Sequence, residues 1–261
     1  MVVSASRQVY YPLMRLQVSL LVLALLVGGC TVSSSSIGSP SASTSPTTAV
    51  TMRPPCPNPD GGVCLGDLDP GTYTTEIFEP RLTYSVPEGW ANFEDTPGNF
   101  LLVPPGADLP GVDANTSDFV GVYTSVYAQN RECATELQAA TAQPGVDTTP
   151  ETIANEFAER PGLVTDGPRS VELGGLTGFV LDVRVDSKWT GTCFYYPTPV
   201  VQLVGGRDPS ALDHCIVAGN AARLYLLGYG DGTLLIEIVD VGNDGSVDSL
   251  DSVAKDFLFE A

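Results

Sequence analysis

An acidic stretch near the C-terminus has the residue types and spacing of a calcium loop. Within residues 240–251, oxygen-bearing side chains fall near positions 1, 5, 7, 9 and 12 of such a loop, and Gly245 stands at position 6. The carboxylates that would bind the ion are Asp240, Asp244, Asp248 and Asp251. However, position 3 is Gly242, position 12 is Asp rather than Glu, and a strand is predicted before the loop. A strand-to-helix turn with a polar cap is therefore the simpler interpretation, with calcium as the alternative.

Residues for acid–base and nucleophilic chemistry are scarce. His214 is the single histidine, and no Gly-x-Ser-x-Gly nucleophile elbow accompanies it. We interpret His214 as structural, paired with Asp213 or with the backbone. No phosphate-binding loop occurs, and no pair of carboxylates is singled out for glycosidase work. The sequence thus favours a non-catalytic protein without a cofactor.

Aromatic residues gather in the predicted loop that contains Trp189, Tyr195 and Tyr196. Aromatic rings in a loop can stack on sugars or peptides, which makes these three residues a candidate ligand surface. The alternative interpretation is that they cover the edge of the core.

The chain has six cysteines, and one of them, Cys30, is set apart by the segment described next. Cys56 and Cys64 bracket a turn-rich loop and are expected to form a disulfide. For the others we favour Cys133–Cys193, because both lie in polar, loop-like surroundings, and we leave Cys193–Cys215 open. Cys215 precedes Ile-Val and is expected to be a buried thiol. The spacing of Cys and His residues does not favour a metal site.

The N-terminal residues have the features of an export signal. Arg7 and Arg15 precede an apolar run from Leu20 to Val27, which is too short to span a bilayer, and no acidic residue occurs before Cys30. Residues 27–30, Val-Gly-Gly-Cys, resemble the lipobox of bacterial lipoproteins. The resemblance implies that residues 1–29 are a signal peptide. It also implies that Cys30 carries acyl chains such as palmitate, which anchor the protein on the extracytoplasmic face of the cell membrane.

Composition divides the rest of the chain into two parts. Residues 30–55 are rich in Ser, Thr and Pro and are expected to be a disordered spacer, and residues 56–261 have the length of one domain. Removal of Arg7 and Arg15 with the signal, and of no acid, changes the net charge from −19 to −21. Such a surface repels nucleic acid. The preference for Arg over Lys indicates a GC-rich, actinobacterial source.

Most of residues 56–261 read as β-strands. Glycines at 174–175 and 230–232 predict two hairpins, and β-rich runs at 73–78, 81–86, 99–103, 118–128 and 199–204 predict further strands. One helix is predicted to begin after Thr149, a second over residues 247–257, and a short one around 209–214. This pattern predicts an α+β fold: an antiparallel sheet with a few packed helices.

The run Tyr84-Ser-Val-Pro-Glu-Gly-Trp90 resembles the start of PsbP- and Mog1-like domains. The Gly174-Gly175 hairpin, the late strand at Arg223 and the terminal helix follow in the order of that fold, over about residues 71–261. The resemblance implies a binding or assembly factor and supplies no catalytic residues. We therefore expect a membrane-anchored module that binds an unknown protein or small molecule. The alternatives are a carboxylate-dependent envelope hydrolase and a structural envelope protein without a ligand.

Overall fold

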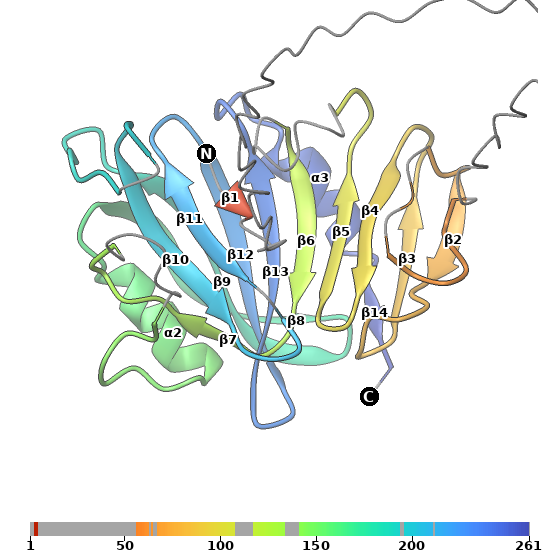
Figure 1. Cartoon of the computed structure of the whole chain (residues 1–261), viewed down its shortest axis with the longest axis horizontal. Helices are drawn as coiled ribbons and strands as arrows, with labels where there is room; N and C mark the ends of the chain where they lie inside the picture. The colour runs from red at the N-terminus through yellow and green to blue at the C-terminus, as the bar shows by residue number, and fades with distance from the viewer. Residues whose placement is uncertain are drawn as a thin grey trace, which may run out of the picture. The chain divides into compact units, whose positions relative to one another are not determined.

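Three antiparallel β-sheets and two helices make up the part of the chain that the computed structural model describes (Figure 1). That part comprises residues 56–62, 64, 67–107, 117–133, 141–193, 196–210 and 212–260, together with the backbone of residues 3–4. Cys30, the spacer at 30–55 and Tyr195 lie outside it, as does the expected signal peptide apart from residues 3–4.

The largest sheet has seven strands in the order β4-β5-β6-β13-β12-β9-β8. Its strands are β4 (Ala91–Thr96), β5 (Asn99–Val103), β6 (Phe119–Tyr123), β13 (Gly232–Asp240), β12 (Ala221–Tyr229), β9 (Leu176–Val185) and β8 (Leu163–Leu173). The second sheet has the order β1-β11-β10-β7, with β1 (Val3–Ser4), β11 (Asp213–Val217), β10 (Val200–Gly206) and β7 (Val126–Ala128). The third contains β14 (Leu258–Phe259), β3 (Leu82–Val86) and β2 (Gly71–Thr74).

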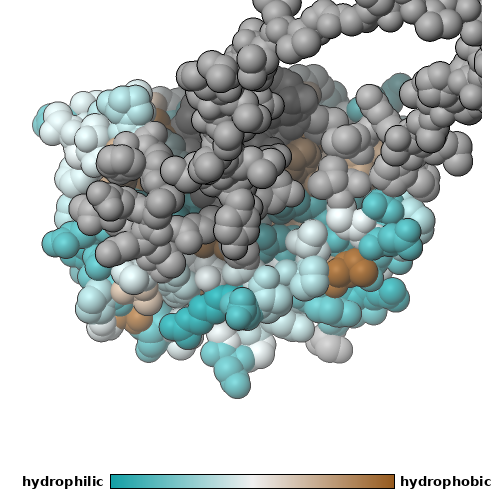
Figure 2. Space-filling view, in the orientation of Figure 1, coloured by the Kyte–Doolittle hydropathy of each residue, from teal (hydrophilic) through white to brown (hydrophobic). Residues whose placement is uncertain are grey.

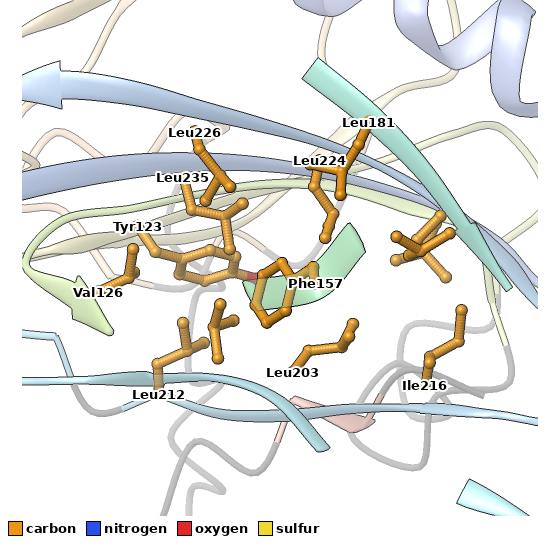
Figure 3. Close-up of a cluster of buried hydrophobic side chains, with 14 of the residues drawn as sticks. Tyr123, Val126, Phe157, Leu181, Leu203, Leu212, Ile216, Leu224, Leu226 and Leu235 are labelled. Carbon is orange, nitrogen blue, oxygen red and sulfur yellow. The ribbon is translucent and has the colours of Figure 1, made fainter. Parts of the chain in front are cut away.

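The central strands β5, β6 and β13 of the seven-stranded sheet are buried on both faces, which explains why they are almost continuously apolar. One face packs on β10, β11 and α2 (Pro150–Ala158), and Figure 3 shows Leu181, Leu224, Leu226 and Leu235 facing Leu203, Leu212 and Ile216 across this core. The other face packs on the third sheet and on α3 (Val247–Ala254). Strands covered on both faces lose the alternation that marks a half-exposed strand. The surface outside these cores is mostly hydrophilic where Figure 2 shows the described residues.

Local sequence explains the two helices and the two hairpins. The hydroxyl of Thr149 accepts the backbone N–H of Thr152 and caps α2, and Pro150 occupies the first turn. In α3, Leu250, Val253 and Ala254 form the buried face. The hairpins β8–β9 and β12–β13 turn at Gly174-Gly175 and at residues 230–231, as predicted.

Three predicted elements differ from the structure. The short helix around 209–214 is wrong: His214 lies in strand β11, where its backbone contributes to the second sheet. The strand predicted over 73–78 ends at Thr74, because the buried Asp95 carboxylate accepts the N–H groups of residues 76, 77 and 78 and holds them in a turn. The run 118–128 is divided into β6 and β7 at Ser125, whose φ is +55°. The helical content is small, so antiparallel sheet with two helices describes the fold better than α+β.

Strand β8 forms one edge of the seven-stranded sheet and contains an irregularity. Its register with β9 shifts between Asp166 and Arg169, at Gly167-Pro168. Gly167 has a φ of +116°, and a Cβ there would lie 2.8 Å from the carbonyl oxygen of Val180. Only glycine fits this close approach of the two strands.

Candidate functional site

A cleft of about 340 Å³ opens on the seven-stranded sheet beside the start of α3. Its floor is formed by the ends of β8, β9 and β12, and its far wall by the loop from Asp240 to Asp248. Ala221 lies in the floor opposite Arg184 of β9 and Asp240 of β13. Because alanine is small, it leaves space between these two longer residues. The volume falls in the range of small-ligand sites, about 300–1,000 Å³.

The Arg223 guanidinium forms one wall of this cleft and is bound to three carboxylates. Its Nε and Nη2 donate to both oxygens of Asp182, at 2.7 and 3.2 Å. Its Nη1 donates to Asp251 at 2.8 Å and to Asp248 at 3.1 Å. The hydrogen bonds to Asp182 above all raise the pKa of Arg223, so the guanidinium stays charged. This wall of the cleft is therefore a charged guanidinium held by three carboxylates.

Asp251 connects this wall to the helix and the sheet. Its side chain is only 1% exposed and accepts the hydroxyl of Tyr225 at 2.6 Å as well as Arg223 and Lys255. Burial, and next the hydrogen bond to Asp251, raise the pKa of Tyr225. These contacts fix α3 on β12 and so set the width of the cleft.

Arg184 differs from Arg223, although both line the cleft. Its side chain is exposed and has no hydrogen-bond or ion-pair partner among the described residues. Asp182, two residues before Arg184 on β9, and Asp248 also line the cleft, and their carboxylates are bound to Arg223. The described lining of the cleft therefore offers the exposed Arg184 cation next to carboxylate oxygens that Arg223 already binds.

The carboxylates of the expected calcium loop have separate roles in the structure. Asp240 is fully buried, and its two oxygens accept the backbone N–H groups of residues 244, 245 and 246 at 3.0–3.1 Å. Asp251 binds Arg223, Tyr225 and Lys255, and Asp248 binds Arg223. No group of three or more His, Cys, Asp or Glu side chains in the described part is arranged to hold a metal ion. The observed arrangement is the polar-capped strand-to-helix turn.

We expect Asp240→Ala to lower the free energy of unfolding by about 1–3 kcal/mol, because three backbone N–H groups of the loop lose the buried carboxylate that accepts them. Urea unfolding measures this loss. Asp244→Ala is the matched control, since that side chain is exposed on the same loop and should cost less than about 0.5 kcal/mol. A calcium-dependent rise in the melting temperature of the unmodified protein would contradict the assignment of Asp240 to capping.

The aromatic residues of the candidate ligand surface are engaged with the core where the structure describes them. Trp189 packs on the core between the first two sheets, and its indole N–H donates to the carbonyl of Val200 at 2.9 Å. Its ring lies against Gly162 and Gly191, where a Cβ would approach within 2.5 Å. Tyr196 packs on a small cluster with Cys215. These placements agree with the core-edge interpretation, and ligand binding by these residues stays a prediction.

The cysteines pair in the structure as Cys56–Cys64 and Cys133–Cys193, with Cα–Cα distances of 5.3 and 5.5 Å. The first bridge closes the loop at 56–64, which the backbone N–H of Cys64 ties to Asn92. The second joins the segment after β7 to the segment before β10. Cys215 is in neither bridge and is buried, and its thiol is hydrogen-bonded to the hydroxyl of Tyr196.

His214 pairs with Glu237 rather than with Asp213. His214 comes from β11 and Glu237 from β13, so this fully buried contact connects the first and second sheets. The Nδ1 atom of His214 bonds one carboxylate oxygen of Glu237, and the rings of Phe119 and Tyr123 pack edge-on against the imidazole. Gly121, opposite Glu237 on β6, leaves room for the Tyr123 hydroxyl, which a Cβ there would meet at 2.2 Å. The pair is sealed from solvent and serves the fold.

Sequence reasoning missed the cleft residues Asp182, Arg184 and Arg223. The sequence did contain a signal for these residues, because charged residues within an apolar strand need partners. Arg223 lies in a run of Leu, Tyr and Ala, and β9 has Asp and Arg at positions 182 and 184. The pairing of the two strands, Arg223 opposite Asp182, could not be read from the sequence.

Comparison with known proteins gives a structural likeness and no match of sequence family. No family model matches the chain, and no curated protein matches it. The solution structure of cyanobacterial PsbP (CyanoP) from Synechocystis sp. PCC 6803 matches with a TM-score of 0.33 and 12% sequence identity, over 76% of this chain and 98% of that chain. None of the described helices is long and apolar enough to span a membrane.

Proposed function

We propose that the protein is a lipid-anchored, extracytoplasmic binding module of the PsbP- and Mog1-like kind, which holds a small ligand in the cleft at Arg184. The observation that carries the proposal is the cleft itself: a hollow over Ala221 in which Arg184 is available while Arg223 is fully paired. The lipobox-like residues at 27–30 support the anchoring, and the acidic composition argues against nucleic acid as a partner.

The chemistry of the cleft favours a small carboxylate that also carries hydroxyl or amino groups. A guanidinium binds a carboxylate through two parallel hydrogen bonds, which suits the exposed Arg184. Asp182 and Asp248 provide acceptor oxygens for hydroxyl or ammonium donors of the same ligand. Both carboxylates are also bound to Arg223, an arrangement that holds charge in place and favours binding over hydrolysis.

We expect a panel of hydroxy acids, amino acids and uronic acids to contain members that raise the melting temperature of the full chain. A ligand at a hundred times its Kd stabilises by about 2.7 kcal/mol, which corresponds to several degrees. Ala221→Leu fills the floor of the cleft and Arg184→Gln removes the cation, so each should abolish the shift. Ser187→Leu adds similar bulk at an exposed turn and should leave it unchanged. A shift that persists in both cleft variants, or a panel without any shift, would refute binding in this cleft.

A further inference from the structure

Three cysteines lie close together around the end of β10. Cys215 forms a buried cluster with Val200 and Val217, and Cys193 packs against this same cluster although its disulfide is with Cys133. The thiol and the disulfide are therefore neighbours in one packed group, although the cysteines are far apart in the sequence.

Two side chains connect the thiol to the disulfide. Gln202 stands directly opposite Cys215 in the β10–β11 pair, and its Nε2 lies 3.6 Å from the Sγ of Cys193. Side chains opposite each other in an antiparallel pair have Cβ atoms about 4.5–5.5 Å apart. Tyr196 makes the second connection: its N–H donates to the carbonyl of Cys193, and its hydroxyl is hydrogen-bonded to Cys215. Each of these contacts leaves a single side chain, Gln202 or Tyr196, between Cys215 and Cys193.

We propose that Cys215 is a resolving thiol for the Cys133–Cys193 disulfide, so that the protein can exchange this bridge for Cys193–Cys215 and release Cys133 as a thiol. In the exchange, the Cys215 thiolate attacks the Sγ of Cys193 and forms a new S–S bond. The bond from Cys193 to Cys133 breaks, and its electron pair leaves on the Cys133 sulfur, which takes up the proton that Cys215 lost. The number of disulfides is unchanged, and the step needs neither an oxidant nor a reductant.

The positions of the three cysteines determine how exposed the remaining thiol is before and after the exchange. Cys215 is only 3% exposed, whereas Cys133 lies in a partly exposed segment beside Arg131 and Glu132. Exchange would replace a buried thiol with one accessible to other molecules. It would also remove the covalent link of the segment whose Arg131 is bound to Glu156 of α2, at 2.7 Å. The exchange thus couples exposure of a thiol to loss of this covalent link.

Disulfide mapping of the full chain carrying Cys133→Ser tests the proposal. With Cys133 absent, Cys193 should pair with Cys215, and mass spectrometry of the non-reduced digest should find this linkage. Alkylation of Cys215 in denaturant without reductant should then fall at least tenfold relative to the unmodified protein. Cys193→Ser is the matched control, in which Cys133 and Cys215 should both be alkylated in full.

Two results would overturn the proposal. One is full alkylation of Cys215 in Cys133→Ser, which would mean that Cys193 cannot reach it. The other is a Cys133–Cys215 bridge in the Cys193→Ser control, which would mean that pairing does not depend on the observed packing. Should Cys133→Ser fail to fold, the unmodified chain is incubated at pH 8.5 and quenched with acid. A Cys193–Cys215 linkage that accumulates with time supports the exchange, and its absence refutes it.

Discussion

Glu237→Ala should lower the free energy of unfolding by about 3–5 kcal/mol, among the largest losses expected from one substitution in this chain. The change removes the partner of His214 at a position with no exposure to water, between the first and second sheets. The imidazole then loses its carboxylate partner while the rings of Phe119 and Tyr123 still pack edge-on against it. One kcal/mol corresponds to about 2–4 °C at this chain length, so the melting temperature should fall by about 10 °C.

Two further variants separate pairing from packing. Glu237→Gln keeps the side-chain shape and one hydrogen bond, so it should lower the free energy of unfolding by less than Glu237→Ala does. The double change His214→Leu with Glu237→Met removes both polar groups at similar volume and should recover most of the stability, since apolar replacement of a buried pair is often neutral. Urea unfolding of the three variants measures these differences. A loss below about 1 kcal/mol for Glu237→Ala would contradict a structural role for the pair.

Cys30→Ala should abolish membrane attachment. The substitution removes the sulfur that would form the thioether, so the protein should lose labelling by a palmitate analogue and collect as unprocessed precursor or as released protein. Each buried CH₂ contributes about 0.8 kcal/mol to anchoring, so loss of two or three acyl chains leaves no durable hold on the bilayer. Membrane fractionation and metabolic labelling check the two effects.

Cys56→Ala is the matched control for this experiment, because that cysteine belongs to the Cys56–Cys64 bridge. It should keep full acyl labelling. Labelling that persists in Cys30→Ala would show that another residue carries the lipid. Because Cys30 is distant in sequence from the cleft residues, loss of anchoring and loss of ligand binding are separate outcomes.

Turns and caps were predictable because their chemistry is local. The Gly174-Gly175 hairpin and the Thr149 cap depend on residues a few positions apart, and both lie in the structure where the sequence places them. Elements whose position depends on tertiary contacts were not predictable from the sequence. His214 reads as the end of a short helix, yet its partner Glu237 belongs to another sheet, and that pairing stabilises a strand. The strand predicted over 73–78 is shortened by Asp95, a carboxylate that follows it by about twenty residues.

The candidate site was likewise predictable only in part. Asp240, Asp248 and Asp251 could be identified from spacing, but only the structure shows that Asp240 caps a loop while Asp251 binds Arg223. The cleft arises from strand register, which places the small Ala221 between Arg184 and Asp240. Strand register depends on packing over the whole sheet, so no local sequence motif indicates it.

The irregular edge of β8 bears on how this protein would behave at the high local density that the proposed lipid anchor implies. An open sheet edge can pair with the edge of another copy and start aggregation. Here the outermost strand is interrupted at Gly167-Pro168, where proline offers no N–H for an incoming strand, and the ion pair of Arg169 with Asp166 lies beside it. Copies tethered side by side would repel each other through their negative charge, and their β8 edges would not pair into a continuous sheet. The bulge would thus keep copies of the protein soluble where the proposed anchor confines them to a membrane plane.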